Sequence, residues 1–380
     1  MVPALQLADA VREARARTGV PGVAAALLAG GEVAAVADGV LELGRDEAVR
    51  PDTPFRIASI SKPFTASLAL SCLALDERLG ALLGHTAGLR PEGWSFYPTE
   101  ERGFFSYSNA GYRAVGKLCG RACGSSFEEA MRTRLLTPLG LGATGYEEPG
   151  APARGHEQEG DNGHRPVPGD AYPEDRRPSG GLWSTGRDLL AFAAHHLGGP
   201  GPLSAEARAT MREPRSEALG AGYGLGWWIR GAPGALTVDH EGSVAGYQSL
   251  LLLRPAEQAA LAVLTNSWRG SGLIRRVVED LGFAPEPPEA AAGAEPRTVA
   301  GRYRLGDVHA AVAAAGEGLL VEETEVDPVT GASASRRYPA TNLGGGVFGF
   351  ARGTLLSHRI DFPRPGLGRI GWVVMPRVEH

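Results

Sequence analysis

The chain has 380 residues, of which 43% are hydrophobic and 21% are charged, as in ordinary globular proteins. Such a length exceeds what one hydrophobic core usually organises, so the sequence predicts two folded units, one large and one small. The formal net charge of -5 and the pI near 6.0 leave no excess of positive charge for binding a phosphate backbone. We therefore expect no nucleic-acid partner.

The amino-terminal residues lack a basic start followed by an apolar run, and no later stretch is long enough to cross a bilayer. We expect no signal peptide, no membrane partner and a cytoplasmic location, unless a leader was trimmed from the chain. Cys72, Cys119 and Cys123 are too few and too irregularly spaced for a disulfide framework or a zinc site. The simplest interpretation is three packed thiols.

The chain begins with helical periodicity over residues 4–17. Two short apolar runs, 23–28 and 32–37, follow on either side of Gly30-Gly31, which is a strong hairpin signal. From residue 59 the pattern changes to helices and long loops, with helices expected at 61–73, 112–121, 127–136 and 187–197. Strand-type runs return at 236–239, 248–253 and 259–265, before a closing helix at 273–281.

Both ends of residues 1–283 thus look like parts of one antiparallel sheet flanked by helices, with a helical region inserted between them, an α/β (α+β) arrangement. We expect a cleft where sheet and helical region meet. Residues 284–298 are rich in Pro, Ala and Glu and indicate a linker. Residues 299–380 carry β-type runs that predict a small antiparallel barrel or sandwich. These runs lie around Tyr303 and at 308–312, 319–323, 347–350, 356–362 and 370–375.

The first motif that carries chemistry is Ser59-Ile60-Ser61-Lys62. At helical spacing the side chains of Ser59 and Lys62 lie on one face, about 5 to 6 Å apart, close enough for an amine to take the hydroxyl proton. Only two of the 38 cationic residues are lysines, Lys62 and Lys117, which suggests that a lysine at position 62 has a specific role. A desolvated lysine can lose its proton and act as a base, whereas an arginine stays protonated. The alternative is a surface lysine, which the apolar residues after it disfavour.

Two further motifs are weaker evidence for a catalytic site when each is taken by itself. In Tyr107-Ser108-Asn109 a phenol can pass its proton to a leaving group and an amide can hold the lysine and the substrate carbonyl. The alternative is a loop tyrosine packed on the core. In His240-Glu241-Gly242-Ser243 the imidazole can bond to substrate, Gly242 can let substrate approach the backbone, and the N–H of Ser243 can complete an oxyanion hole. The alternative is a structural histidine.

The three motifs in this order, S-x-x-K, Y-S-N and H-x-G followed by a strand, resemble the serine β-lactamase and penicillin-binding protein superfamily. The sequence resembles the class C β-lactamase-like branch, which includes esterases, DD-peptidases, D-aminopeptidases and the penicillin-binding-protein-type thioesterases that cyclise peptides. Supporting matches are LLGHTAGL, PSGGLWSTGRDL, YGLGWW and LAVLTNS. GRYRL at 301–305 resembles the opening of the C-terminal lipocalin-like domain that some members carry. The resemblance implies a β-lactamase/transpeptidase-like fold for residues 1–283.

Two departures from the family pattern matter. Region 78–84 is shortened, because LALDERLG runs directly into ALLGHTAGL, which implies a more open cleft. His240 stands where true β-lactamases and many penicillin-binding proteins have lysine. A histidine at this position resembles the esterase and peptidase branch, which disfavours a role in antibiotic resistance.

Serine acyl-transfer chemistry needs no metal or other cofactor, and we find no motif in the sequence that would bind one. The polar loop GHEQEGDNGHRP contains His156 and His164, but its spacing is not that of a metal site, so a solvated loop is preferred. No G-x-S-x-G, G-x-G-x-x-G or P-loop motif is present.

The resulting hypothesis is a serine hydrolase that forms an acyl-enzyme. Neutral Lys62 takes the proton of Ser59, the N–H groups of Ser59 and Ser243 hold the oxyanion, and Tyr107, tuned by Lys62 and His240, protonates the leaving group while Asn109 orients the substrate. We expect the pocket that holds the small-molecule or peptide acyl substrate to be shaped by four aromatic residues: Trp94, Tyr223, Trp227 and Tyr247.

Three functions stay open from the sequence. The first is hydrolysis of esters or amides, including D-amino-acid peptides. The second is transfer of the acyl group to an amine, as in an acyltransferase or peptide cyclase of specialised metabolism. The third is a non-catalytic binding module, disfavoured because the Ser, Lys and Tyr of the motifs are all present. The sequence leaves the oligomeric state open.

Overall fold

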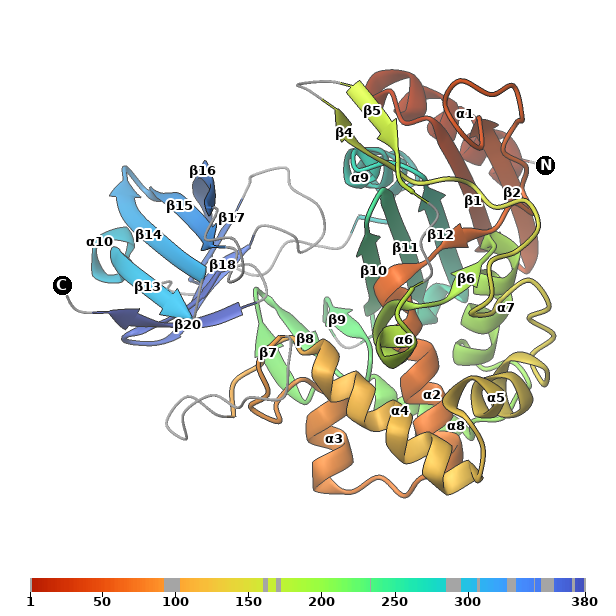
Figure 1. Ribbon diagram of the computed structural model, residues 1–380, viewed down its shortest axis with the longest axis horizontal. Coiled ribbons are helices and arrows are strands. Elements are labelled where there is room, and N and C mark those ends of the chain that lie inside the picture. Colours follow the sequence, from red (N-terminus) through yellow and green to blue (C-terminus); the bar gives the residue numbers. More distant parts are fainter. Residues whose placement is uncertain are drawn as a thin grey trace. The chain divides into compact units, whose positions relative to one another are not determined.

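A computed structural model describes residues 2–91, 103–159, 163–168, 172–232, 234–284, 295–305, 308–326, 333–344, 346–349, 359–370 and 373–378. The chain divides into two compact units (Figure 1). The first unit comprises Met1–Gly84, Asn109–Arg215 and Tyr223–Pro285. The second, the barrel unit, comprises His85–Ser108, Ser216–Gly222 and Glu286–His380. Most of the expected linker at 284–298 lies outside the described residues, and the domain boundaries at 283 and 299 stay predictions.

The first unit is built on an antiparallel sheet with the strand order β2-β1-β12-β11-β10-β9. The strands are β1 (Gly22–Ala29), β2 (Glu32–Gly39), β9 (Trp228–Arg230), β10 (Thr237–Val244), β11 (Tyr247–Arg254) and β12 (Ala259–Thr265). Because β1 pairs with β12, the two ends of the unit share one sheet, as the sequence predicts. The β1–β2 hairpin turns at Gly30 and Gly31, which both have positive φ angles, 59° and 78°, as a tight two-residue turn requires.

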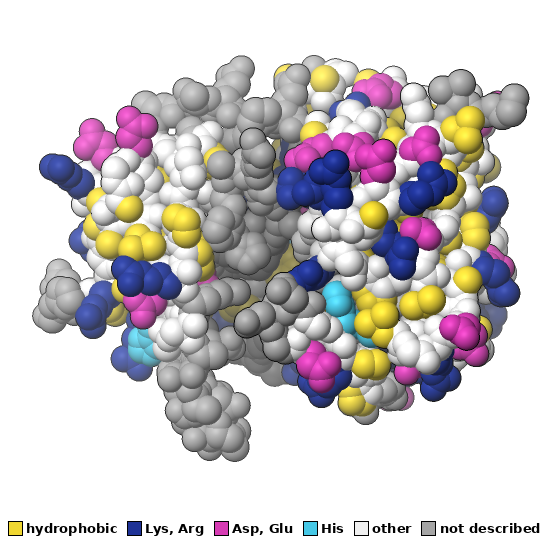
Figure 2. Space-filling view, turned by 90° about the horizontal axis from the view of Figure 1, so that it is seen from above, with side chains coloured by type: hydrophobic (Ala, Val, Ile, Leu, Met, Phe, Trp, Pro, Cys, Tyr) yellow, Lys and Arg dark blue, Asp and Glu magenta, His cyan; other side chains and the backbone are white. Residues whose placement is uncertain are grey.

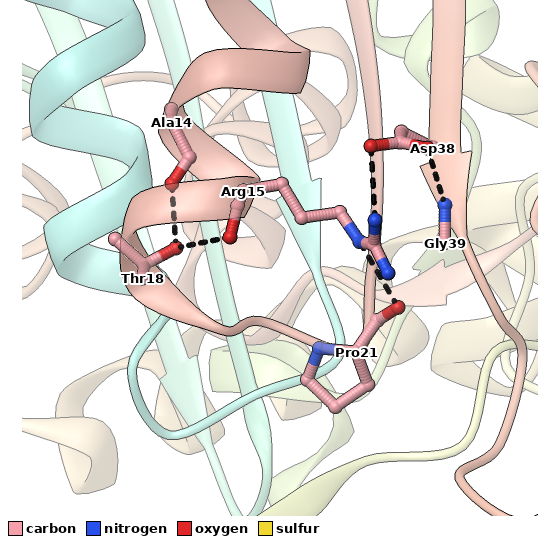
Figure 3. Close-up of polar contacts among 6 residues, drawn as sticks. All are labelled: Ala14, Arg15, Thr18, Pro21, Asp38 and Gly39. Carbon is pink, nitrogen blue, oxygen red and sulfur yellow. Dashed lines mark hydrogen bonds and ion pairs between the residues drawn. The ribbon is translucent and has the colours of Figure 1, made fainter.

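Helices α1 (Val2–Thr18) and α9 (Gly270–Asp280) pack against each other and the sheet, and α7 (Gly186–His196) packs against β1, β11 and β12. The last turns of α1 are fixed to the end of β2 (Figure 3). Arg15 donates to Asp38 Oδ2 at 3.1 Å and to the Pro21 carbonyl at 3.3 Å. Gly39 has no room for a side chain, because a Cβ atom would lie 2.0 Å from the Pro21 carbonyl oxygen. These contacts fix where the chain enters the sheet.

The inserted region is helical, as expected (Figure 1). Its elements are the 3₁₀ turn η1 (Ala58–Ile60), α2 (Ser61–Cys72), α3 (Glu77–Leu83), α4 (Asn109–Cys123), α5 (Phe127–Met131), the π-helical turn η3 (Arg132–Leu136), η4 (Glu174–Arg176), α6 (Arg177–Gly180) and α8 (Ala205–Met211). Short strand pairs join β3 (Phe55–Arg56) to β6 (Trp183–Ser184) and β4 (His156–Glu159) to β5 (Gly163–Pro166). None of the helices in the described residues has the length and apolar character to cross a bilayer.

The barrel unit contains a closed barrel of strands β13 to β20 in chain order. They are β13 (Gly301–Leu305), β14 (Val308–Ala315), β15 (Gly318–Val326), β16 (Ser333–Gly344), β17 (Val347–Gly349), β18 (Ile360–Arg364), β19 (Leu367–Ile370) and β20 (Val373–Val378), preceded by α10 (Pro296–Val299). The core includes Tyr303, Val321, Tyr338 and Phe348. This closed up-and-down barrel agrees with the expected lipocalin-like domain.

One strand prediction in the barrel is wrong. The run at 370–375 is not a single strand, since Ile370 ends β19 and pairs with Val373, the first residue of β20. The apolar residues of this run belong to both arms of a hairpin, which a run of hydrophobic letters does not reveal. Part of the predicted strand 356–362 and the end of 347–350 lie outside the described residues.

Positive charge on the surface is carried mainly by arginines, several of which pair with neighbouring carboxylates. Arg132 bonds to Glu129 at 2.6 Å and Arg12 to Asp9 at 2.8 Å, both at helical spacing. Figure 2 shows acidic and basic side chains interspersed over the face in view.

Candidate active site

The candidate nucleophile follows a strained turn. Ala58 has a φ of 46°, in the left-handed region that alanine rarely adopts, and it begins the 3₁₀ turn η1 that leads into α2. Ser59 lies within this turn and is only partly buried, while the residues on either side of it are buried. The turn therefore leaves the Ser59 side chain accessible at the start of a buried helix.

Residues 178–184 hold this turn in place. The Ile57 N–H donates to the Leu182 carbonyl at 3.0 Å, and the Leu182 N–H donates to Ser61 Oγ at 3.1 Å. Thr65 Oγ1 donates to the Pro178 carbonyl at 2.7 Å. The β3–β6 pair extends the same contact one residue before Ile57. Backbone bonds from a segment 120 residues away in sequence thus fix the geometry around Ser59.

Lys62 is fully buried and its amine reaches the candidate nucleophile. Its Nζ lies 3.1 Å from Ser59 Oγ, 2.8 Å from Asn109 Oδ1 and 2.7 Å from the Ser179 carbonyl oxygen. The ring of Tyr112 lies 5.5 Å away. The structure thus brings together Ser59, Lys62 and Asn109 of the predicted site.

The contacts of Lys62 suit an uncharged amine as well as an ammonium group. The Asn109 and Ser179 oxygens are amide carbonyl oxygens, which only accept hydrogen bonds. A neutral amine has two N–H donors for these oxygens and one lone pair, which then faces the Ser59 hydroxyl. In that state Ser59 donates its proton toward Nζ, which is the geometry of a general base.

Strand β10 packs directly against the nucleophile turn. A Cβ atom on Gly242 would lie 2.1 Å from the Ile57 carbonyl oxygen and 2.2 Å from Ser249 Oγ, and Ser249 donates to the same carbonyl at 3.0 Å. The space that Gly242 leaves on its Cβ side is therefore filled by protein. That substrate approaches the backbone at Gly242 stays a prediction. The next residue, Ser243, is exposed and its Oγ accepts from Gln248 at 2.9 Å.

His240 is buried on β10 and is uncharged. Burial first, and then the charge of Lys62, lower the pKa of His240 from 6.5 to about 3. Its Nδ1 lies 2.6 Å from the Glu241 carbonyl oxygen, which assigns the ring proton to Nδ1. Nε2 is then an acceptor, 3.3 Å from the hydroxyl of Tyr223. Because burial is the larger cause, the imidazole stays neutral whether or not Lys62 is charged.

Tyr107 belongs to the barrel unit, where His85 supports it. The two rings are 4.4 Å apart, and His85 Nδ1 accepts a hydrogen bond from the Ser108 N–H at 3.0 Å. His85 also has a positive φ of 59°, and its carbonyl accepts from the Ser106 N–H at 2.9 Å. Only Ser108 separates Tyr107 from Asn109 in the chain, so the Cα atoms of Tyr107 and Asn109 are at most about 7 Å apart.

A comparison with protein families identifies the family of this chain. The family model described as Beta-lactamase matches residues 7–79 and 76–281, well over half of the chain. The chain belongs to the Beta-lactamase family. The match divides at residues 76–79, beside the region that is shortened in the sequence.

Similar proteins cover different shares of the chain. Penicillin-binding protein 4 of Amycolatopsis lactamdurans is 28% identical over 348 residues, covering 74% of this chain and 91% of that protein. The crystal structure of SurE has a TM-score of 0.73 at 23% identity and covers 98% of both chains, and its structure with D-Leu has a TM-score of 0.71. A class C β-lactamase from Rhodobacter sphaeroides has a TM-score of 0.64 at 22% identity and covers 73% of this chain and 98% of its own.

The four aromatic residues expected to shape the pocket have different places in this β-lactamase-family protein. Trp227 is fully buried in the core, where its ring stacks with Phe192 at 6.1 Å and meets His196 at 5.3 Å. We therefore assign Trp227 to the core. Tyr247 is buried too, and its hydroxyl donates to the Ala153 carbonyl at 3.0 Å. Tyr223 contacts His240, as above. Trp94 lies outside the described residues.

The polar loop at 156–166 forms the β4–β5 hairpin. His156 is buried, with Nε2 accepting from the Leu43 N–H at 3.0 Å and Nδ1 facing the Asn266 carbonyl oxygen at 2.9 Å. Burial lowers the pKa of both His156 and His164. Across the described residues, no three His, Cys, Asp or Glu side chains gather in a way that could hold a metal ion.

Sequence reasoning missed two parts of the site. Ser179 contributes a backbone carbonyl, which any residue type supplies, so only the match of PSGGLWSTGRDL to the family pattern signals the segment. The left-handed conformation of Ala58 has no signal, because alanine is not a residue that such a conformation favours.

Proposed function

We propose that this protein is a serine hydrolase that cleaves esters or amides through an acyl-enzyme on Ser59. The observation that carries the proposal is the buried Lys62 amine, 3.1 Å from Ser59 Oγ and bonded to two carbonyl oxygens. Family membership supports the same type of activity. A non-catalytic binding module is disfavoured because such a module has no use for a buried lysine held against a serine hydroxyl.

The proposed acylation follows from these contacts. Ser59 Oγ attacks the carbonyl carbon as its proton passes to Lys62, and the N–H groups of Ser59 and Ser243 stabilise the oxyanion. The bond from the carbonyl carbon to the leaving group then breaks, and Tyr107 gives its proton to the departing amine or alkoxide. Lys62 returns a proton to Tyr107. In deacylation water loses a proton to neutral Lys62, either directly or through Tyr107, which then passes its own proton to Lys62; Ser59 Oγ regains this proton as its bond to the acyl carbon breaks, by microscopic reversibility.

His240 limits the substrates that this proposal admits. A neutral imidazole offers no positive charge to a substrate carboxylate. Its acceptor nitrogen, Nε2, faces the Tyr223 hydroxyl. We therefore propose acyl groups without a free carboxylate at this position. The D-Leu in a solved structure of SurE supports a D-amino-acid residue as part of the substrate.

Acyl transfer to an amine is the second candidate. Neutral His240 is compatible with it, because Nε2 can accept a hydrogen bond from an incoming amine in place of the one from the Tyr223 hydroxyl. All other residues would keep the roles they have in hydrolysis. The two functions then differ only in whether the amine or water reaches the acyl-enzyme first.

The test uses matched pairs of N-acetyl dipeptide esters that end in D-Leu or L-Leu, with and without a primary amine. Mass spectrometry of the products separates acid from amide. We expect the D-ester to be preferred by at least about tenfold, as a stereospecific pocket gives, and Ser59→Ala to be inactive. Amide formed in place of acid would favour the transferase. Equal rates for both enantiomers would contradict the D-specific substrate, and activity retained by Ser59→Ala would contradict the proposed function.

A further inference from the structure

The barrel unit contains two segments from the middle of the chain besides the barrel itself, residues 85–108 and 216–222. Both lead into the proposed active site. The first carries Tyr107, and the second continues into Tyr223, whose hydroxyl contacts His240. The barrel residues that bond to these two segments are therefore in a position to influence catalysis.

Arg369 of β19 binds the first segment. Its side chain is 1% exposed, its Nε donates to the Phe105 carbonyl oxygen at 3.1 Å, and its guanidinium group lies 5.8 Å from the Phe105 ring. Nη1 donates to both carboxylate oxygens of Asp361, on the neighbouring strand β18. One buried arginine thus bonds to the backbone two residues before Tyr107.

Asp361 binds the second segment. The Leu219 N–H donates to Asp361 Oδ2 at 2.6 Å, and the Leu219 carbonyl accepts from Arg359 at 3.0 Å. Leu219 and Gly220 have φ angles of 56° and 76° in the turn between β7 (Ser216–Ala218) and β8 (Ala221–Tyr223). Such a conformation is unfavourable for leucine. The barrel residues therefore satisfy both polar backbone groups of a strained residue.

Apolar contacts and His85 complete the support of the first segment. Phe104 packs against Leu367 and Val374 of the barrel. The ring of Phe105 also meets the ring of His85, edge to face, at 5.5 Å. Residues 104–108 are therefore bonded both to the barrel and to His85, which itself contacts Tyr107.

We propose that the Arg369–Asp361 ion pair of the C-terminal barrel positions Tyr107 for proton transfer, by holding the 104–108 segment and the 216–222 hairpin in one arrangement. This inference rests on the proposed function, in which Tyr107 protonates the leaving group. Arg369 and Asp361 are positioning residues, since they act through the Phe105 and Leu219 backbones.

The energetics of buried ion pairs favour this interpretation over a purely stabilising role. Removing an arginine and an aspartate from water is costly, and a hydrophobic pair of similar volume is often as stable. A buried pair that also bonds to the backbones of two separate segments fixes the positions of both segments. Proton transfer is sensitive to the position of the donor, because a displacement of about 1 Å can lower a rate by about a hundredfold.

The test separates the Tyr107-dependent step from acylation in general. A p-nitrophenyl ester expels a leaving group that needs no proton, whereas the alkyl amide of the same acyl group needs one. We would measure single-turnover acylation of both by the full-length protein and by Arg369→Met, Tyr107→Phe and their double variant. Arg337→Met is the control, because Arg337 is an exposed arginine on another barrel strand. The paired variant Arg369→Met with Asp361→Leu leaves no unpaired buried charge and guards against misfolding.

We expect Arg369→Met and the paired variant to lower amide acylation by about ten- to a hundredfold, with ester acylation close to that of the Arg337→Met control. Thermal unfolding of the paired variant should stay close to that of the control, whereas Arg369→Met alone should unfold at a lower temperature because it leaves Asp361 unpaired. The double variant with Tyr107→Phe should be no slower than Tyr107→Phe alone. Two outcomes would show that the inference is wrong while the proposed function stands. In the first, Arg369→Met and the paired variant keep the amide acylation rate although Tyr107→Phe loses it. In the second, Arg369→Met and the paired variant slow ester and amide acylation equally. If Tyr107→Phe itself keeps the amide rate, the proposed role of Tyr107 fails and the inference with it.

Discussion

The nucleophile turn around Ser59 and the segment around Tyr107 are held in different ways. Backbone bonds from residues 178–184 and the close packing of Gly242 fix the turn within the core of the first unit. The Tyr107 segment is fixed by side chains, His85 and Arg369, in the barrel unit. A substitution near Ser59 should therefore lower both the free energy of unfolding and the reaction rate, whereas a substitution near Tyr107 should lower mainly the reaction rate.

The largest effect is expected at Lys62. Lys62→Met removes the proposed base and should lower kcat/KM by about a hundred- to ten-thousandfold. Lys62→Arg should fail similarly, because a guanidinium group stays protonated. The chain offers a matched control in Lys117→Met, since Lys117 is the other lysine and is exposed. Steady-state kinetics that left Lys62→Arg as active as the native chain would refute the proposed base.

Gly242→Ala tests the packing of the nucleophile turn. The added Cβ would lie 2.1 Å from the Ile57 carbonyl oxygen, so β10 or the turn has to move. We expect the free energy of unfolding to fall by about 1–3 kcal/mol, with a loss of rate, in urea denaturation and kinetics. Gly142→Ala is the control, because a Cβ there meets nothing within 4 Å. An unchanged unfolding midpoint for Gly242→Ala would contradict the packing.

His85 tests the other region. His85→Ala removes the acceptor of the Ser108 N–H and the ring beside Tyr107, and should slow amide turnover about tenfold by misplacing the phenol. His85→Asn keeps an acceptor and tolerates the positive φ, so it should recover part of the rate. Asparagine no better than alanine would show that the hydrogen bond is not what matters.

The smallest effect is the pH dependence that His240 contributes. Its pKa is about 3 in the folded protein and 6.5 is the ordinary value, so the unfolded chain binds more protons between these pH values. Stability should therefore fall as the pH drops below about 6.5, by up to about 1.4 kcal/mol per pH unit from this group. The free energy of unfolding of His240→Gln, measured by urea denaturation at several pH values, should fall less steeply with decreasing pH than that of the native chain, and an equal slope would contradict the neutral imidazole.

The sequence predicts the parts of the structure that residue type controls. Gly30 and Gly31 mark the first hairpin, and the spacing of Ser59 and Lys62 correctly predicts that their side chains meet. It does not predict that the Tyr107 segment joins the barrel unit, because the Arg369–Phe105 bond uses a backbone carbonyl 264 residues away. The sequence also does not distinguish a pocket role from a core role for Trp227, because a large aromatic residue suits a core and a cleft equally well.

Intact-protein mass spectrometry after brief exposure to an activated acyl ester and an acid quench shows whether Ser59 carries the acyl group. We predict one added acyl group on the native chain and none on Ser59→Ala. An adduct that persists on Ser59→Ala, or a native chain that neither gains mass nor turns over the ester, would contradict this role of Ser59.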